Sequence, residues 1–214
     1  PSEPERLRRL VSAYIHESGV KPAACHVAAL VAPHAGYVYS GPTAGFAYAR
    51  VKGSRPGRVI LLGCSHREYV PAASVWTRGA FDTPLGSFPI DEPFADAVAQ
   101  ETGPSPESPH RLEHSLEVQL PFIAEAIGLV PIVPVLFGPH FASWHIGFAS
   151  LLASHTDPGD LIVASTDLSH YLNENDANAI DQCTLQAVLS RDWRAFAKGA
   201  STDHFSMCGA TAVA

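Results

Sequence analysis

Basic residues and long apolar stretches are both scarce in this sequence. Lys and Arg together number 14 against 21 Asp and Glu, which gives a formal net charge of −7. Affinity for a nucleic-acid backbone depends on clustered Lys and Arg, so this balance argues against a nucleic-acid partner. No apolar run approaches the roughly 18 residues of a membrane span, and no signal-peptide pattern is present. We therefore expect no membrane association.

Paired cysteines and the common motifs for phosphate or acyl chemistry are also missing. No two of the four cysteines have C-x-x-C spacing; they are Cys25, Cys64, Cys183 and Cys208. In a chain of this size such cysteines are typical of free thiols in a reducing compartment, so we expect a cytoplasmic location. The motifs G-x-x-x-x-G-K-[ST], G-x-G-x-x-G and G-x-S-x-G do not occur. Phosphate chemistry and a serine-nucleophile elbow are therefore without support.

The chain does have enough apolar sequence for one full-sized domain. Its 214 residues are 46% hydrophobic, which is typical of a globular protein. Short apolar segments separated by helical patterns predict a mostly parallel sheet with helices on both faces. These segments are residues 27–32, 58–62 and 161–164. Residues 130–137 contain two prolines and are interpreted as an edge or bulged strand. Residues 41–51 can form a small-residue helix, and residues 114–127 a helix broken at Pro121.

Histidines follow the predicted strands at the point where each strand ends. His34 follows the first strand and His66 the second, and both lie in loops with few charges. The third strand is followed by Asp167 and His170. In parallel α/β sheets, ligands bind beyond the carboxyl ends of the strands, so we expect these side chains to share one pocket. For Asp167, capping of the following turn is an equally good interpretation.

Two further groups have both a functional and a structural interpretation. Glu113, His114 and Glu117 cluster at a helix start, where a carboxylate and an imidazole on one face can bind a metal. On spacing alone, a helix-capping network is preferred for them. Cys208 precedes a glycine at an expected helix start, so it is either a metal-binding thiolate or a buried structural thiol.

The residue types restrict the metal. Two or three imidazoles with a thiolate or a carboxylate suit iron, zinc or copper, and not magnesium or calcium. Two histidines and one anionic ligand, with open positions, are typical of non-haem iron oxygenases. A catalytic zinc site has the same composition.

Five segments, in this order, resemble the Memo family, whose bacterial and archaeal members are called AmmeMemoRadiSam system protein B. They span most of the chain and read APHAGYVYSG (32–41), LLGCSH (61–66), EHSLEVQLPF (113–122), STDLSHY (165–171) and CGA (208–210). The family is similar in fold to the class III extradiol dioxygenases, a three-layer α/β/α sandwich. The resemblance implies a single Memo-like domain over residues 1–214. We expect it to be trimmed at both ends, because the chain begins without Met and stops inside a helical pattern.

The resemblance also implies a ligand set. It assigns a metal to His34, His66 and Cys208, with Asp167 and His170 lining the same pocket and His170 at an acid/base position. Iron or copper with a redox role is the implied cofactor. The chain departs from the family pattern at Cys64, where the family usually has proline two residues before the histidine. This second thiol either makes the site sensitive to oxidation or fills space.

Our first hypothesis is a dioxygenase-like oxidoreductase that binds Fe(II), with copper or zinc as alternative metals. His170, supported by Asp167, is the expected acid/base toward a small hydroxylated or carbonyl substrate. The second hypothesis is a non-catalytic metal- or peptide-binding module with Tyr37, Tyr39 and Tyr171 as pocket walls. The third is a zinc hydrolase. Substrate identity does not follow from the sequence, and a homo-oligomer is left open.

Overall fold

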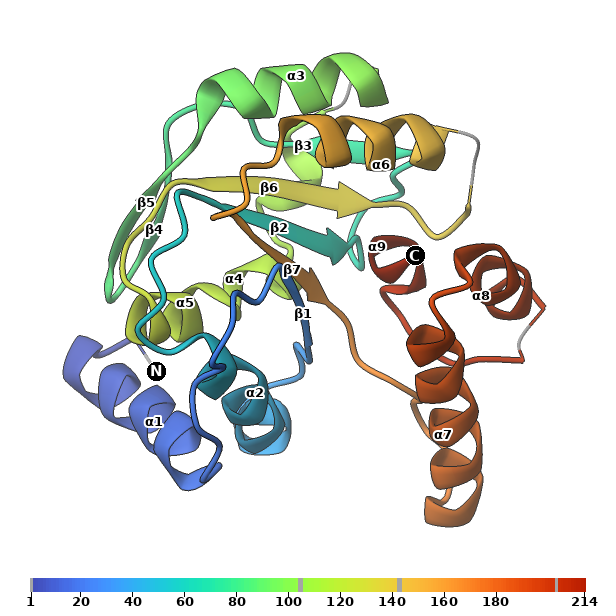
Figure 1. Ribbon diagram of the computed structural model, residues 1–214, viewed down its shortest axis with the longest axis horizontal. Helices are drawn as coiled ribbons and strands as arrows, with labels where there is room; N and C mark the ends of the chain where they lie inside the picture. The colour runs from blue at the N-terminus through green and yellow to red at the C-terminus, as the bar shows by residue number, and fades with distance from the viewer. Residues whose placement is uncertain (1, 104–105, 142–143, 203) are drawn as a thin grey trace.

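A five-stranded sheet lies at the centre of the molecule (Figure 1). The computed structural model describes residues 2–103, 106–141, 144–202 and 204–214. In the order of the sheet, the strands are β1 (Ala29–Ala32), β7 (Leu161–Ser165), β2 (Val59–Cys64), β6 (Ile132–Phe137) and β3 (Ala73–Val75). The first four are parallel and only β3 runs antiparallel. The expected mostly parallel sheet is thus confirmed.

Helices cover the sheet on two sides, as expected for a three-layer arrangement (Figure 1). One layer contains α1 (Pro4–Glu17), α2 (Tyr37–Val51), α4 (His114–Glu117) and α5 (Leu120–Ala126). The other contains α3 (Glu92–Thr102) and α6 (Trp144–His155). The chain ends in α7 (Glu174–Ser190), α8 (Trp193–Ala200) and α9 (Ala210–Val213). Among the described residues, no helix is long and apolar enough to cross a membrane.

Three smaller elements complete the described part of the chain. The hairpin β4 (Ala80–Thr83) and β5 (Gly86–Pro89) forms a separate two-stranded sheet, and η1 (Ser108–His110) is a single turn. In Figure 1, α7 projects away from the sheet, whereas α9 packs against the carboxyl-terminal parts of the sheet strands. The last residues of the chain thereby lie next to the ends of strands that come earlier in the sequence.

The uniformly apolar strands are those in the middle of the sheet. Every residue of β2 and of β6 is buried, because both strands have neighbours on each side and helices on each face. Each Val, Leu or Ile buried in this way contributes about 1.5–3 kcal/mol. The edge strand β1 is partly exposed. Burial on both faces therefore explains why these strands show no polar alternation.

The expectation of an edge or bulged strand at residues 130–137 is wrong, because β6 lies between β2 and β3. The backbone N–H of Trp76 donates to the carbonyl of Pro134 at 3.3 Å, one residue past the end of β3. The nitrogen and oxygen of one strand residue point to the same side. The missing N–H of Pro134 therefore faces the end of the short strand β3, where the hydrogen-bond ladder stops.

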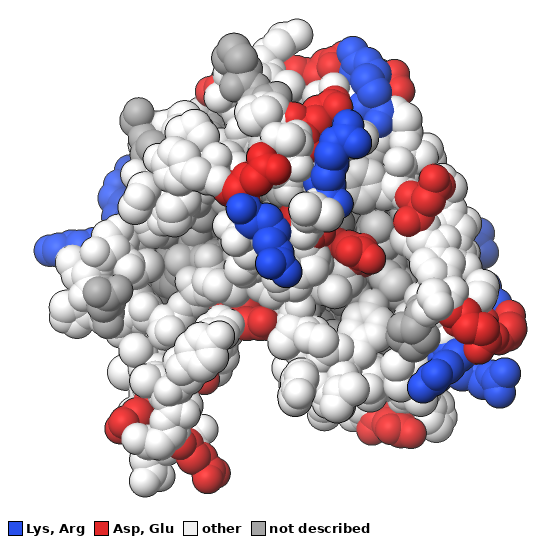
Figure 2. Space-filling view, turned by 180° about the vertical axis from the view of Figure 1, so that it is seen from behind, with Lys and Arg blue, Asp and Glu red and all other residues white. Residues whose placement is uncertain are grey.

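Charges of opposite sign lie close together, both at the surface and partly buried. Arg58 contacts Asp91 and Asp160, each at 2.8 Å, and Arg78 contacts Asp96 at 2.7 Å. On the face drawn in Figure 2, most Lys and Arg side chains lie beside Asp or Glu. That face consequently shows no broad patch of positive charge.

Gly63 provides a test of the packing between β2 and α4. A Cβ at Gly63 would lie 2.6 Å from Leu116 Cδ2 and 2.7 Å from Ser115 Oγ. We expect Gly63→Ala to lower the free energy of unfolding by about 1–3 kcal/mol through overpacking, measured by urea denaturation. Gly159→Ala is the matched control, because no atom lies within 4 Å of its Cβ position. Equal stability of the two variants would contradict this packing.

Candidate metal centre

The carboxyl ends of β1, β7 and β2 bring the predicted site residues to one edge of the sheet. The three strands are neighbours. His34, Asp167 and His66 each follow the end of one of them by two residues. The ring centroids of His34 and His66 are 5.1 Å apart. The expected convergence of these strand ends is therefore present in the structure.

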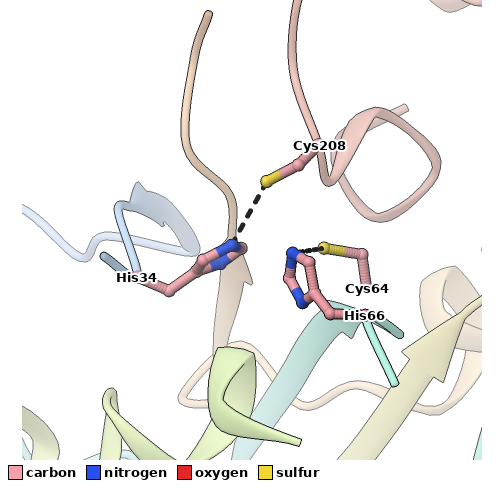
Figure 3. A group of neighbouring side chains, drawn as sticks. All are labelled: His34, Cys64, His66 and Cys208. Carbon is pink, nitrogen blue, oxygen red and sulfur yellow. Dashed lines mark hydrogen bonds between the residues drawn. The ribbon is translucent and has the colours of Figure 1, made fainter. Parts of the chain in front are cut away.

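Four side chains form a compact group of potential metal ligands (Figure 3). Its members are His34, Cys64, His66 and Cys208, whose ligand atoms all lie within 4.8 Å of one another. His34 Nε2 is 3.2 Å from Cys208 Sγ, and His66 Nε2 is 3.6 Å from Cys64 Sγ. Two imidazoles and two thiols at these distances can hold one borderline or soft metal ion.

His34 is oriented by Ser165, the last residue of β7. The imidazole is 1% exposed, and its Nδ1 is 3.0 Å from Ser165 Oγ. That hydroxyl donates its one proton to the Ser115 carbonyl at 2.5 Å and accepts from Gln119 Nε2 at 2.8 Å. Ser165 must therefore accept from His34, so Nδ1 carries the hydrogen. His34 Nε2 is the ring nitrogen left to face Cys208 Sγ or a metal.

Gln119 completes this buried network, and neither Gln119 nor Ser165 is among the site residues predicted from the sequence. Its Nε2 also donates to the Pro33 carbonyl at 2.9 Å, and its Oε1 accepts from Tyr48 Oη at 2.8 Å. These partners determine which end of the amide faces Ser165. The available signal was an uncharged polar residue within apolar sequence, LIVAS for Ser165 and EVQLPF for Gln119. Such buried polar groups need partners.

His66 is held in an equivalent way by Glu113. One carboxylate oxygen lies 2.9 Å from His66 Nδ1, and the other accepts from the backbone N–H of His66 at 2.6 Å. Because a carboxylate only accepts, His66 Nδ1 carries the hydrogen and Nε2 faces the sulfur atoms. Glu113 also caps α4 by accepting from the Ser115 N–H at 2.8 Å. The capping interpretation of Glu113 is therefore confirmed, and the same carboxylate also holds His66.

The contacts of His66 shift two pKa values in the metal-free protein. Hydrogen bonding with the Cys208 thiolate, and then with Glu113, raises the pKa of His66 to about 9. Burial alone would raise the pKa of Glu113, but hydrogen bonds from His66 and from the Ser115 backbone lower it to about 2. The pair is consequently ionised near neutral pH.

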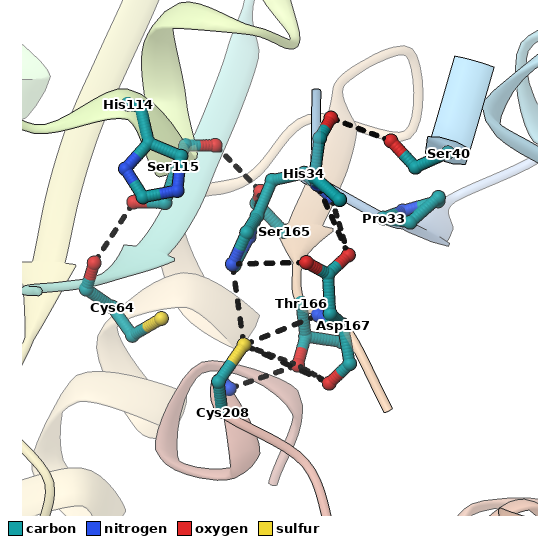
Figure 4. A network of polar contacts seen from close by, with 12 residues as sticks. Pro33, His34, Ser40, Cys64, His114, Ser115, Ser165, Thr166, Asp167 and Cys208 are labelled. Atoms are coloured by element: carbon teal, nitrogen blue, oxygen red, sulfur yellow. Dashed lines mark hydrogen bonds and ion pairs between the residues drawn. The ribbon is translucent and has the colours of Figure 1, made fainter. Parts of the chain in front are cut away.

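Cys208 reaches the site because the turn before α9 lies against the end of β7. The N–H of Cys208 donates to the Asp167 carbonyl, and the N–H of Asp167 donates to Cys208 Sγ, both at 3.2 Å (Figure 4). A Cβ on Gly209 would lie 2.7 Å from the Ser165 carbonyl oxygen, so the turn needs glycine there. Contact with Cys64, His34 and His66 lowers the pKa of the Cys208 thiol. The same thiol–thiolate contact, with burial, raises the pKa of Cys64.

Asp167 positions the loop that carries His34. Its Oδ1 accepts from the backbone N–H of His34 at 2.8 Å and from that of Ala35 at 3.3 Å, while Oδ2 is 3.8 Å from His34 Nε2. The carboxylate thus joins the loop after β1 to the loop after β7. Asp167, which follows β7, therefore belongs to the site because it holds the loop of His34, not because it is one of the four potential ligands.

The family model for Memo-like proteins matches residues 1–214. The chain belongs to the Memo family. A MEMO1 family protein of Methanopyrus kandleri is 33% identical over 223 residues, which cover 98% of this chain and 79% of that protein. Those of Thermotoga maritima and Thermotoga sp. strain RQ2 are 35% and 34% identical over 190 residues, 86% of this chain and 69% of each relative. The Memo family has the dioxygenase-like fold, so the expected fold class is confirmed.

In this Memo-family chain a third imidazole adjoins the group. The ring of His114 is 4.6 Å from that of His66 and 5.5 Å from that of His34. His66, Glu113 and His114 form a second set of potential ligands around the shared residue His66. Burial lowers the pKa of His114, so a neutral imidazole lies beside the candidate centre.

The structure does not bring the other expected residues into the four-residue group. His170 and Tyr171 lie on the loop after β7, where His170 is exposed and Tyr171 is 104% exposed with φ +61°. Helix α2 begins at Tyr37, earlier than the expected residues 41–51. Tyr37, Tyr39 and Glu117 consequently line a different groove, against α1. Tyr37 there donates to the Val118 carbonyl at 2.8 Å, and Tyr39 is 83% exposed.

Glu113→Gln tests the carboxylate contact with His66. A carboxyl group whose pKa falls from 4.5 to about 2 on folding stabilises the protein above pH 4.5 and loses that contribution as the pH falls toward 2. At neutral pH we expect the unfolding free energy of the metal-free variant to be about 1.5–3 kcal/mol below that of wild type. On acidification we expect the unfolding free energy of the variant to fall less than that of wild type. Urea denaturation across this pH range measures both.

Glu117→Gln is the control, because it removes an exposed carboxylate from the same short helix. Identical acid profiles for Glu113→Gln and wild type would contradict the role assigned to Glu113.

Proposed function

We propose that this Memo-family chain binds one non-haem Fe(II) ion through His34, His66 and Cys208 and acts as an oxidoreductase on a small organic substrate. The observation that supports the metal centre is the orientation of the two imidazoles. In each, Nδ1–H has a protein acceptor and Nε2 faces the sulfur atoms. This is the arrangement in which neutral imidazoles bind metals.

The donor set supports a transition metal. Imidazole and thiolate suit iron, copper or zinc, whereas magnesium and calcium prefer oxygen. Bound Fe(II) with open positions would supply a place where O₂ and an organic substrate bind together. All four cysteines are free, which supports a reducing compartment such as the cytoplasm.

The surrounding residues supply orientation and proton transfer. Glu113 and Ser165 hold the imidazoles of His66 and His34, and Asp167 positions the loop that carries His34. His170 is the proposed general acid/base. It lies on an exposed loop, so it exchanges protons directly with solvent, and a substrate must extend over this loop to meet it.

We expect about one equivalent of iron after anaerobic purification. His34→Ala and His66→Ala each remove one of the two imidazoles, so both variants should lose the metal, measured by elemental analysis. His16→Ala, which changes an exposed histidine of α1, is the control and should retain it. Stoichiometric zinc in place of iron would overturn the Fe(II) assignment. Metal retained in both site variants would overturn the site itself.

The oxidoreductase activity has its own test. We expect the iron-loaded protein to consume O₂ with at least one member of a catechol panel, and His170→Ala to slow that reaction without loss of iron. An oxygen electrode measures the rate, and iron content is determined on the same samples. A full iron site with no O₂ consumption would favour a non-catalytic module that binds a small molecule or a peptide.

A further inference from the structure

Cys64 is the one member of the four-residue group that the proposed function leaves without a role. It is the last residue of β2 and is 6% exposed. Its Sγ lies 3.6 Å from His66 Nε2. In Figure 3 this sulfur points toward a ring nitrogen of His66, and the sulfur of Cys208 points toward a ring nitrogen of His34.

The position of Cys64 is determined by rigid elements. Its carbonyl accepts from Ser115 Oγ at 2.9 Å, which anchors the end of β2 to the start of α4. Its strand neighbour in the register is Phe137 of β6. A side chain on an anchored strand end is held more firmly than one on a free loop, which suits a ligand that needs fixed geometry.

The distances match those of a four-coordinate metal site. Metal–nitrogen bonds of about 2.0–2.1 Å and metal–sulfur bonds of about 2.3 Å place tetrahedral ligand atoms about 3.3–3.8 Å apart. The His34–Cys208 and His66–Cys64 nitrogen–sulfur distances are 3.2 and 3.6 Å, and all four ligand atoms lie within 4.8 Å of one another. A small contraction of the group is therefore enough to form such a site.

A purely structural role accounts less well for this thiol. A cysteine that only fills space would direct its sulfur toward apolar neighbours. The sulfur of Cys64 instead faces an imidazole nitrogen whose other ring nitrogen is already paired with Glu113.

We propose that Cys64 is a fourth metal ligand, so that two imidazoles and two thiolates hold the ion. This inference rests on the proposed metal centre and adds one ligand to it. Binding replaces the S–H bond of Cys64 with a sulfur–metal bond and the Nε2–H bond of the His66 imidazolium with a nitrogen–metal bond, and both protons go to solvent. The two thiolate charges balance a divalent ion. With four protein ligands on the ion, O₂ and a substrate would bind at the fifth and sixth positions of Fe(II) or displace Cys64.

Cobalt(II) is the probe for the number of sulfur ligands, because thiolate-to-cobalt charge transfer absorbs in the near ultraviolet. We expect Cys64→Ser and Cys208→Ser each to reduce this absorption to about half that of wild type, since each removes one of two thiolates. In both variants the affinity for cobalt should fall by at least about 10–100-fold, because loss of an outer-shell partner alone costs that much. Cys183→Ser removes an exposed thiol and is the matched control, with unchanged absorption.

X-ray absorption spectroscopy of the zinc-loaded wild-type chain gives a second measurement that does not depend on folding of a variant. We expect two sulfur neighbours at about 2.3 Å and two nitrogen neighbours at about 2.0–2.1 Å. One sulfur neighbour, or unchanged cobalt absorption in Cys64→Ser beside a loss in Cys208→Ser, would overturn this inference alone. No cobalt absorption in wild type would overturn the metal centre as well.

Discussion

The hydrogen bond between His34 Nδ1 and Ser165 Oγ is the contact on which the arrangement of the site depends. Ser165 has one proton and gives it to the Ser115 carbonyl, so the imidazole must be the donor. That single proton determines the tautomer of His34 and leaves Nε2 without a hydrogen. The hydrogen bonds of Ser165 also join the ends of β1 and β7 to the start of α4. A buried network of this kind stabilises the structure only when every member has a partner.

Two carboxylates perform related tasks on opposite sides of the group. Glu113 accepts from the backbone and the imidazole of His66. Asp167 accepts from the backbone N–H groups of His34 and Ala35, and its second oxygen lies near the imidazole of His34. Each acid thus fixes a loop and limits the movement of a histidine. The two histidines of the candidate centre follow strand ends, and each is held to another element through both its backbone N–H and its ring.

Much of this arrangement could be predicted from the sequence, because apolar strands and residues directly after them have local signatures. The convergence of His34 and His66 required only that parallel strands end at one edge. The sequence could not indicate that β7, the last strand of the chain, lies between β1 and β2. The contact of Cys208 with His34 spans 174 residues, so no periodicity predicts it. Tyr37 was expected to be a wall of the metal pocket because the segment after His34 has the sequence of a loop. In the structure α2 begins at Tyr37, so this side chain lies in the groove against α1.

The distance along the chain between His34 and Cys208 gives the candidate centre a mechanical role as well. An ion bound at both ends of this interval would act as a cross-link that closes a loop of 174 residues. Such a link restricts the unfolded chain more than a local one does, by an amount that grows with the logarithm of loop length. Helix α7 projects from the body, and only Thr184 along it is buried. The segment after β7 returns to the sheet through the turn that carries Cys208 and through α9, which packs against β2, β7 and β6. An ion bound between His34 and Cys208 would add a further link between this segment and the sheet.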